Sequence, residues 1–119
     1  MKKILIIEDN ESNRDLLSFL LQYSRFEVVT AADGVEGVET AVKELPDLIL
    51  MDIQMPNLDG LKATREIRGI EETKDIPIIA VTSYVMPGDR EKILSAGCNG
   101  YIGKPVNTDT IVDEIKKYL

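Results

Sequence analysis

Short apolar runs alternate along the chain with longer segments in which apolar residues recur every three or four positions. The short runs lie at residues 4–7, 26–30, 48–51, 77–82 and 100–103. Runs of this length with little polar alternation are typical of strands buried on both faces, as in a parallel sheet covered by helices. The intervening segments have the spacing of amphipathic helices. We therefore expect five strand–helix units.

Capping residues and helix breakers predict where some of these helices begin and end. Asn10 or Ser12 is expected to cap the first helix, whose apolar positions are Leu16, Leu17, Phe19, Leu20 and Leu21. The second helix should stop before Pro46. The last should begin after an Asn107 or Thr108 cap, with an inward face made of Ile111, Val112, Ile115 and Leu119.

The size of the chain and its regular alternation predict a single α/β domain over residues 1–119. With 119 residues, 44% of them hydrophobic, the chain can bury one core but is too short for two. Short connections between units favour a five-stranded parallel sheet with helices on both faces. The flavodoxin-like strand order 2-1-3-4-5 suits five units, and it makes the first and third strands neighbours.

Polar side chains follow four of the five predicted strands. They are Glu8 and Asp9, Asp52, Thr82 and Ser83, and Lys104. Taken singly, each has an ordinary explanation as a turn, cap or surface residue. In the expected sheet, however, all of them meet at the carboxyl edge, where open α/β folds place their chemistry.

Three converging carboxylates would repel one another unless a cation lay among them. Mg²⁺ prefers oxygen ligands and keeps several waters, so it suits an open site made of Glu8, Asp9 and Asp52. With the hydroxyl of Thr82 and the ammonium of Lys104, this set favours phosphoryl transfer to the Asp52 carboxylate.

Composition narrows the choice of partners. The formal net charge of −7 argues against binding to nucleic acid or to an anionic membrane surface. Histidine is absent, so a phosphohistidine donor must belong to another molecule. The single cysteine, Cys98, allows no internal disulfide, and no apolar stretch is long enough to span a bilayer. We expect a cytoplasmic protein.

The chain resembles, over its whole length, the receiver domain of two-component response regulators, and most of all the short stand-alone members of that CheY-like family. The resemblance rests on the segments Ile6-Ile7-Glu8-Asp9-Asn10, Asp47 to Pro56, Asp59-Gly60, Ile79 to Ser83, Ala96-Gly97 and Tyr101 to Pro105. Their order and spacing together are highly specific.

The resemblance implies that Asp52 accepts a phosphoryl group from a sensor histidine kinase or a histidine phosphotransfer protein. Asp9, the Asp52 side chain and the backbone carbonyl of Gln54 would hold Mg²⁺. Glu8 would act nearby or through a water molecule. The activity of the chain itself would be limited to phosphotransfer and dephosphorylation of its own Asp52, so we do not expect an enzyme with a separate substrate.

The same resemblance assigns a switch. Thr82 would turn toward the phosphoryl oxygen, Lys104 would pair with that group, and Tyr101 would change rotamer as the readout. Lys104-Pro105 resembles the cis peptide of the family. The sequence fits either a free-standing regulator or a receiver that is part of a hybrid kinase. If the chain is the whole protein, the signal should leave through the surface of the fourth helix, last strand and last helix. That surface would contact a downstream protein and is a candidate face for a phosphorylation-linked homodimer.

Rival functions differ at identifiable positions. A flavin or dinucleotide carrier needs a glycine- or hydroxyl-rich phosphate loop after the first strand, where this chain has Glu8 and Asp9. A Mg²⁺-dependent aspartyl-phosphate hydrolase remains an alternative, although it would need an acid at the position of Gln54. A receiver-like adaptor that works without phosphorylation is the other alternative. Gln54 and Tyr84 would flank the path of the hydrolytic water, and the bulky ring of Tyr84 predicts a long-lived phosphorylated state.

Overall fold

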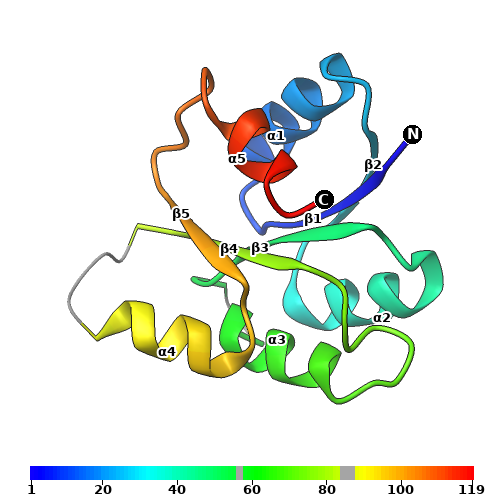
Figure 1. Ribbon diagram of the computed structural model, residues 1–119, viewed down its shortest axis with the longest axis vertical. Helices are drawn as coiled ribbons and strands as arrows, with labels where there is room; N and C mark the ends of the chain where they lie inside the picture. Colours follow the sequence, from blue (N-terminus) through cyan, green and yellow to red (C-terminus); the bar gives the residue numbers. More distant parts are fainter. Residues whose placement is uncertain (56–57, 84–87) are drawn as a thin grey trace.

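The computed structural model describes residues 1–55, 58–83 and 88–119, and within them five strands form one parallel sheet (Figure 1). The strands are β1 (Lys3–Ile7), β2 (Glu27–Ala31), β3 (Leu48–Asp52), β4 (Ile78–Thr82) and β5 (Gly100–Gly103). Their order is β2-β1-β3-β4-β5, and every neighbouring pair is parallel. The expected flavodoxin-like α/β fold is confirmed.

Helices cover both faces of this sheet. They are α1 (Glu11–Tyr23), α2 (Gly34–Glu44), α3 (Gly60–Arg68), α4 (Asp89–Ala96) and α5 (Ile111–Lys116). Figure 1 shows α1 and α5 on one side of the sheet and α2, α3 and α4 on the other. No helix in the described parts of the chain has both the length and the apolar character that crossing a membrane requires.

Alternate residues of each central strand feed two separate cores, because successive side chains of a strand point to opposite faces. On the α1 and α5 side, Ile4, Leu48 and Leu50 pack with residues such as Leu21 and Ile115. On the other side, the core consists of residues including Leu5, Ile7, Ile49, Met51, Ala63, Ile67 and Ile93. Both faces of the sheet are therefore buried under helices, which explains the uninterrupted apolar runs.

Capping residues fix the start of the first helix as expected but not that of the last. Asn10 caps α1, since its side chain accepts a hydrogen bond from the amide of Asn13 at 2.9 Å. At the other end of the chain, Asn107 accepts instead from the amide of Asp109 at 2.9 Å, which makes a turn. The helix begins only at Ile111, so the expected cap at Asn107 or Thr108 is wrong.

The inward face expected for the last helix needs one correction. Ile111 and Ile115 are fully buried, and Val112 packs against the same core. Leu119, in contrast, is 40% exposed, because α5 ends at Lys116 and the chain leaves the helical path before it.

Strand register brings the polar strand ends to one edge of the sheet. Ile7 lies opposite Met51, Asp52 opposite Val81, and Thr82 opposite Gly103. The residues that directly follow β1, β4 and β5 therefore lie at the same edge as Asp52. Gly60 holds the loop after Asp52 close to the sheet, since a side chain there would clash with the carbonyl oxygen of Asp52.

Candidate functional site

Asp52 is the last residue of β3, and its carboxylate is only 2% exposed. Its Oδ1 atom lies 3.1 Å from Nζ of Lys104 and accepts a hydrogen bond of 3.0 Å from the amide of Gln54. The carboxylate is thus held from both sides, by the loop that follows its own strand and by the loop that follows β5. The Lys104-Pro105 peptide in that second loop is cis, as expected.

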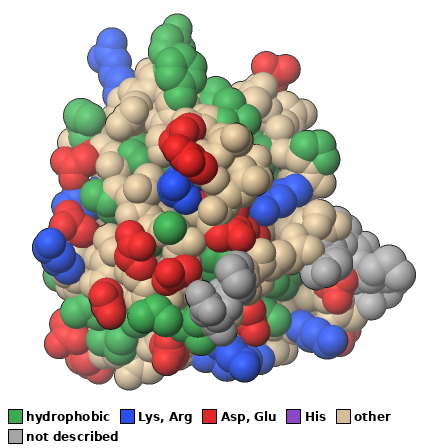
Figure 2. Space-filling view, turned by 180° about the vertical axis from the view of Figure 1, so that it is seen from behind, with side chains coloured by type: hydrophobic (Ala, Val, Ile, Leu, Met, Phe, Trp, Pro, Cys, Tyr) green, Lys and Arg blue, Asp and Glu red, His purple; other side chains and the backbone are tan. Residues whose placement is uncertain are grey.

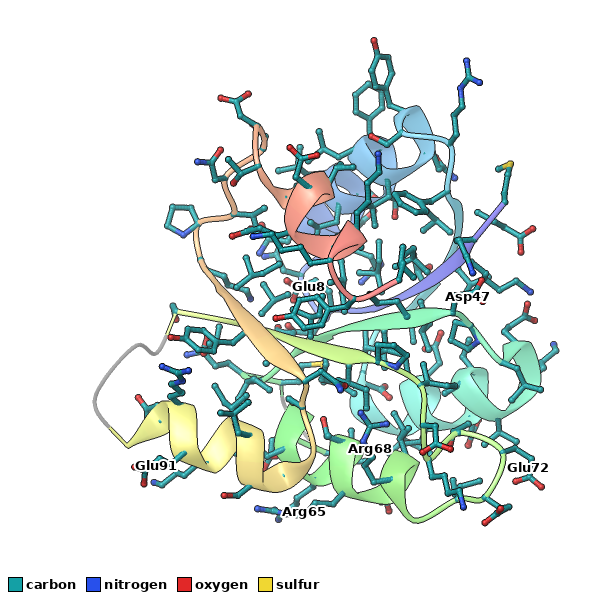
Figure 3. The ribbon with its side chains drawn as sticks, viewed as in Figure 1. Glu8, Asp47, Arg65, Arg68, Glu72 and Glu91 are labelled. Carbon is teal, nitrogen blue, oxygen red and sulfur yellow. The ribbon has the colours of Figure 1, made fainter. Side chains whose placement is uncertain are left out.

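Glu8, directly after β1, is as deeply buried as Asp52. Its Oε1 atom lies 3.2 Å from Nζ of Lys104, so a single ammonium group contacts two buried carboxylates. The backbone of Glu8 is held by Arg14, whose guanidinium donates to the Glu8 carbonyl at 2.9 Å. Figure 3 places Glu8 on the side of the sheet covered by α1 and α5, away from Arg68 of α3.

Asp9 completes a cluster of three acids. Glu8, Asp9 and Asp52 each offer one carboxylate oxygen, and these oxygens lie within 4.8 Å of one another. Glu8 and Asp52 are buried while Asp9 is exposed, which leaves one side of the cluster open to solvent. Lys104 alone does not balance three carboxylates. An oxygen-only donor set with surplus negative charge and an open side fits a hard divalent cation such as Mg²⁺.

Burial and crowding also shift the proton affinities of this cluster. Burial, and then the neighbouring Glu8, raise the pKa of Asp52 to about 6, although the Gln54 amide and Lys104 act in the opposite direction. Burial alone would lower the pKa of Lys104, but the hydrogen bond and charge of Asp52, together with Glu8, outweigh it and raise that pKa. At neutral pH, Asp52 is therefore largely ionised and Lys104 is charged.

Thr82 ends β4 next to this cluster. Its side chain is fully buried, and its carbonyl accepts a hydrogen bond of 2.8 Å from the amide of Lys104. The backbone contact fixes the loop that carries Lys104 to the end of β4. The strand ends predicted to carry the chemistry are thus brought together.

Tyr101 and Tyr84, the other residues given a role, are less closely tied to the cluster. Tyr101 lies on the edge strand β5, opposite Ala80, and is 36% exposed, whereas its neighbours Gly100 and Ile102 are buried. Its change of rotamer stays a prediction. Tyr84 lies outside the described residues, and the Gln54 carbonyl stays a predicted ligand.

A contact that the sequence did not predict joins the loops after β3 and β4. The side-chain oxygen Oε1 of Gln54 accepts hydrogen bonds from Ser83, at 2.9 Å from the hydroxyl and 3.4 Å from the amide. The sequence does contain a signal for this contact. Gln54 lies two residues after the end of β3, and Ser83 directly follows the end of β4, the neighbouring strand. Arg14, the donor to Glu8, was likewise missed.

A groove of about 400 Å³ opens beside the site, between α1 and the segment that follows β5. Leu16, Leu17 and Val106 supply apolar walls, and Glu8 and Lys104 lie at its polar end. Elsewhere the surface is rich in acids, and Figure 2 shows Asp and Glu side chains spread over the face opposite to that of Figure 1.

Comparison with known proteins agrees with this geometry. The family described as the response regulator receiver domain matches residues 4–116. The polar-differentiation response regulator DivK of Brucella ovis is 42% identical over 118 residues, which cover 99% of this chain and 96% of that protein. DivK is a relative of the kind that the sequence motifs resemble.

Two solved structures show the same fold. The chemotaxis protein CheY4 of Vibrio cholerae has a TM-score of 0.96 and 32% identity, with 100% of this chain and 99% of that chain covered. The receiver domain of the sensor histidine kinase PA1611 from Pseudomonas aeruginosa has a TM-score of 0.91 and 38% identity, covering 98% and 96%. That structure has a magnesium ion coordinated in its active site cleft. The strand-end cluster, the strand order and these similarities together show that this chain belongs to the response regulator receiver domain family of two-component signalling.

Proposed function

We propose that this chain is a phosphoacceptor switch in which Asp52 takes a phosphoryl group from a phosphohistidine of a partner protein. The observation that carries the proposal is the buried Asp52 carboxylate, held 3.1 Å from Lys104 inside a cluster of three acids. An acceptor carboxylate, a neighbouring cation and a set of metal-binding oxygens are the parts that phosphoryl transfer to an aspartate requires.

The chemistry follows from the positions of these groups. An Asp52 oxygen attacks the phosphorus of the donor phosphohistidine, the new P–O bond forms as the P–N bond breaks, and the imidazole leaves and takes a proton from solvent. Lys104, which pairs with the free carboxylate, stays within reach of the phosphoryl oxygens once the group has moved. Thr82, at the end of the next strand, supplies a hydroxyl on the same edge.

The acidic cluster is the proposed Mg²⁺ site. Asp9, Asp52 and the backbone carbonyl of Gln54 would hold the ion, with Glu8 beside it. The bound ion would supply positive charge, which would offset the negative charge of the acceptor carboxylate and of the phosphoryl group. The proximity of the three carboxylates and the magnesium ion in the active site cleft of the PA1611 receiver support this assignment.

The donor is a sensor histidine kinase or a histidine phosphotransfer protein. Membership of the family supports this, and so does the absence of histidine from the 119 residues, because the phosphohistidine must then lie outside them. The groove that ends at Lys104 leaves room for a side chain of such a partner next to the acceptor.

Phosphorylation would be read on the face formed by α4, β5 and α5. Tyr101 supports this proposal because it lies on β5 and is 36% exposed, so that a change of its rotamer would alter the surface. This face would bind a downstream protein or a second phosphorylated copy of the chain.

The chain is a signalling domain and acts as an enzyme only on its own Asp52. A hydrolase using an aspartyl-phosphate intermediate needs a proton donor near the leaving group, and Gln54 is a neutral amide. A phosphorylation-independent adaptor would have no need for a buried acid, a lysine and a threonine at one sheet edge.

Incubation with acetyl phosphate and Mg²⁺ separates these three functions when bound phosphoryl groups and released phosphate are measured together. One bound group per chain, with release no faster than decay of that adduct, supports the switch. Rapid multiple turnover of acetyl phosphate without accumulation of the adduct would identify a hydrolase. If the folded protein formed no adduct and released no phosphate, the adaptor would be the remaining function.

A further inference from the structure

Gln54 and Ser83 form a bridge across the outer side of the acceptor site. Ser83 donates twice to Oε1 of Gln54, from its hydroxyl at 2.9 Å and from its backbone amide at 3.4 Å. Ser83 is exposed and Gln54 is half-buried, so the bridge lies where solvent reaches the site. It ties together the loops that follow β3 and β4.

The backbone of Gln54 fixes this bridge next to the acceptor. Its amide donates to Oδ1 of Asp52 at 3.0 Å, so the side chain of Gln54 starts within contact distance of the reacting carboxylate. Ser83 directly follows Thr82, and Asp52 is in register with Val81. Both ends of the bridge are therefore positioned by the same strand pair that positions the acceptor.

The direction of these hydrogen bonds decides what Gln54 can offer to water. A glutamine side chain has one carbonyl oxygen with two lone pairs, and the two bonds from Ser83 use both. A glutamine that orients an attacking water, as in GTPases, needs its amide group available to that water. Here the only atom of the Gln54 side chain that can accept a hydrogen bond from water, its carbonyl oxygen, is occupied by Ser83.

We propose that Ser83 is a positioning residue that prolongs the phosphorylated state of Asp52 by holding the Gln54 carbonyl away from the hydrolytic water. The inference rests on the proposed phosphoacceptor function. In the step that is slowed, the water oxygen forms a bond to phosphorus and the P–O bond to Asp52 breaks. Asp52 leaves as a carboxylate, and the water protons stay on the released phosphate or pass to solvent.

The test measures first-order loss of the phosphoryl group, in Mg²⁺ and after removal of a small phosphodonor, in five proteins. They are the wild type, Ser83→Ala, Ser83→Thr, Gln54→Met and the double variant Ser83→Ala with Gln54→Met. Ser83→Ala removes the hydroxyl bond and leaves the longer bond from the backbone amide, so one of the two lone pairs of the Gln54 oxygen becomes available to water. Decay should then accelerate roughly threefold to tenfold, the effect of one oriented hydrogen bond. Ser83→Thr keeps the hydroxyl and should decay like the wild type.

Gln54→Met separates this mechanism from a simple widening of the site. Methionine has no side-chain amide, so adding Ser83→Ala to Gln54→Met should no longer accelerate decay. The inference would be overturned if Ser83→Ala accelerated decay equally in the wild-type and Gln54→Met backgrounds, or if Ser83→Ala alone caused no acceleration. Either result would leave the acceptor role of Asp52 intact. If none of the five folded proteins forms an adduct, the proposed function fails and this inference fails with it. Thermal unfolding of each variant checks that it is folded.

Discussion

Nζ of Lys104 lies 3.1 Å from Oδ1 of Asp52 and almost as close, at 3.2 Å, to Oε1 of Glu8. Both carboxylates are 2% exposed, so this one ammonium offsets much of the repulsion between two buried acids. The lysine thus has a role in the unphosphorylated protein as well as the one proposed for it in phosphoryl transfer.

Lys104→Met should therefore damage both folding and phosphorylation. Two buried carboxylates lose their shared cation, and we expect the free energy of unfolding at pH 7 to fall by about 1–3 kcal/mol without Mg²⁺. The rate of phosphorylation by acetyl phosphate should fall at least tenfold, which is about 1.4 kcal/mol of activation free energy. Urea unfolding and intact-protein mass measure the two effects.

Lys117→Met is the matched control, because Lys117 is exposed and lies beyond α5. It should leave both quantities within error of the wild type. If Lys104→Met behaved like this control in both assays, the charge balance described for the site would be wrong.

Asp52→Asn should stabilise the metal-free protein at high pH. The pKa of Asp52 is raised to about 6, so the folded state favours the protonated acid more than the unfolded state does. The resulting stability is present in full below the usual aspartate pKa, near 4, and is lost as the pH rises through 6. Asparagine mimics the neutral acid at every pH.

Thermal unfolding in EDTA from pH 4 to pH 8 measures this effect. The midpoint of Asp52→Asn should exceed that of the wild type by several degrees at pH 8, and the gap should close toward pH 4. A gap that is constant over the range would show that ionisation of Asp52 has no part in it.

Mg²⁺ should stabilise the wild type and do so more strongly above pH 6, where Asp52 is ionised. Asp9→Asn removes the exposed member of the cluster and should weaken Mg²⁺ binding at least tenfold. Asp15→Asn changes an exposed acid of α1 by the same one charge and should bind like the wild type. Isothermal titration with MgCl₂ compares them; equal affinities in all three would place the ion elsewhere.

Gly60→Ala should distort the acceptor loop, because the added methyl group would clash with the carbonyl oxygen of Asp52 and lie 2.7 Å from Cα of Ile53. We expect a loss of about 1–3 kcal/mol in the free energy of unfolding, together with slower phosphorylation. At Gly69 the nearest atom to an added methyl is 3.5 Å away, so Gly69→Ala is the control. Similar unfolding curves for the two variants would contradict the close approach at Gly60.

The fold could be predicted because its signals are local and redundant. Buried strands such as β3 are apolar on both faces up to their last residue, and the strand order then places the polar strand ends at one edge. The convergence of Glu8, Asp9 and Asp52 follows from that topology, without knowledge of any side-chain conformation.

Features that depend on rotamers or on competing turns could not be predicted. The bridge from Ser83 to Gln54 requires one side-chain conformation among several, and nothing in the spacing selects it. Asn107 has the composition of a helix cap but makes a turn that delays α5. Phe19 fits the apolar pattern of α1, yet it is 65% exposed and stacks on Tyr23 in solvent, because that pattern is wider than the face that the sheet covers.

The central claim is that Asp52 accepts the phosphoryl group. Intact-protein mass after incubation with phosphoramidate, in Mg²⁺ and in EDTA, tests it most directly when wild type and Asp52→Asn are compared. The account predicts a gain of one phosphoryl group in the wild type with Mg²⁺, and none in EDTA or in Asp52→Asn. An equal gain in folded Asp52→Asn, or no gain in the folded wild type with Mg²⁺, would contradict it.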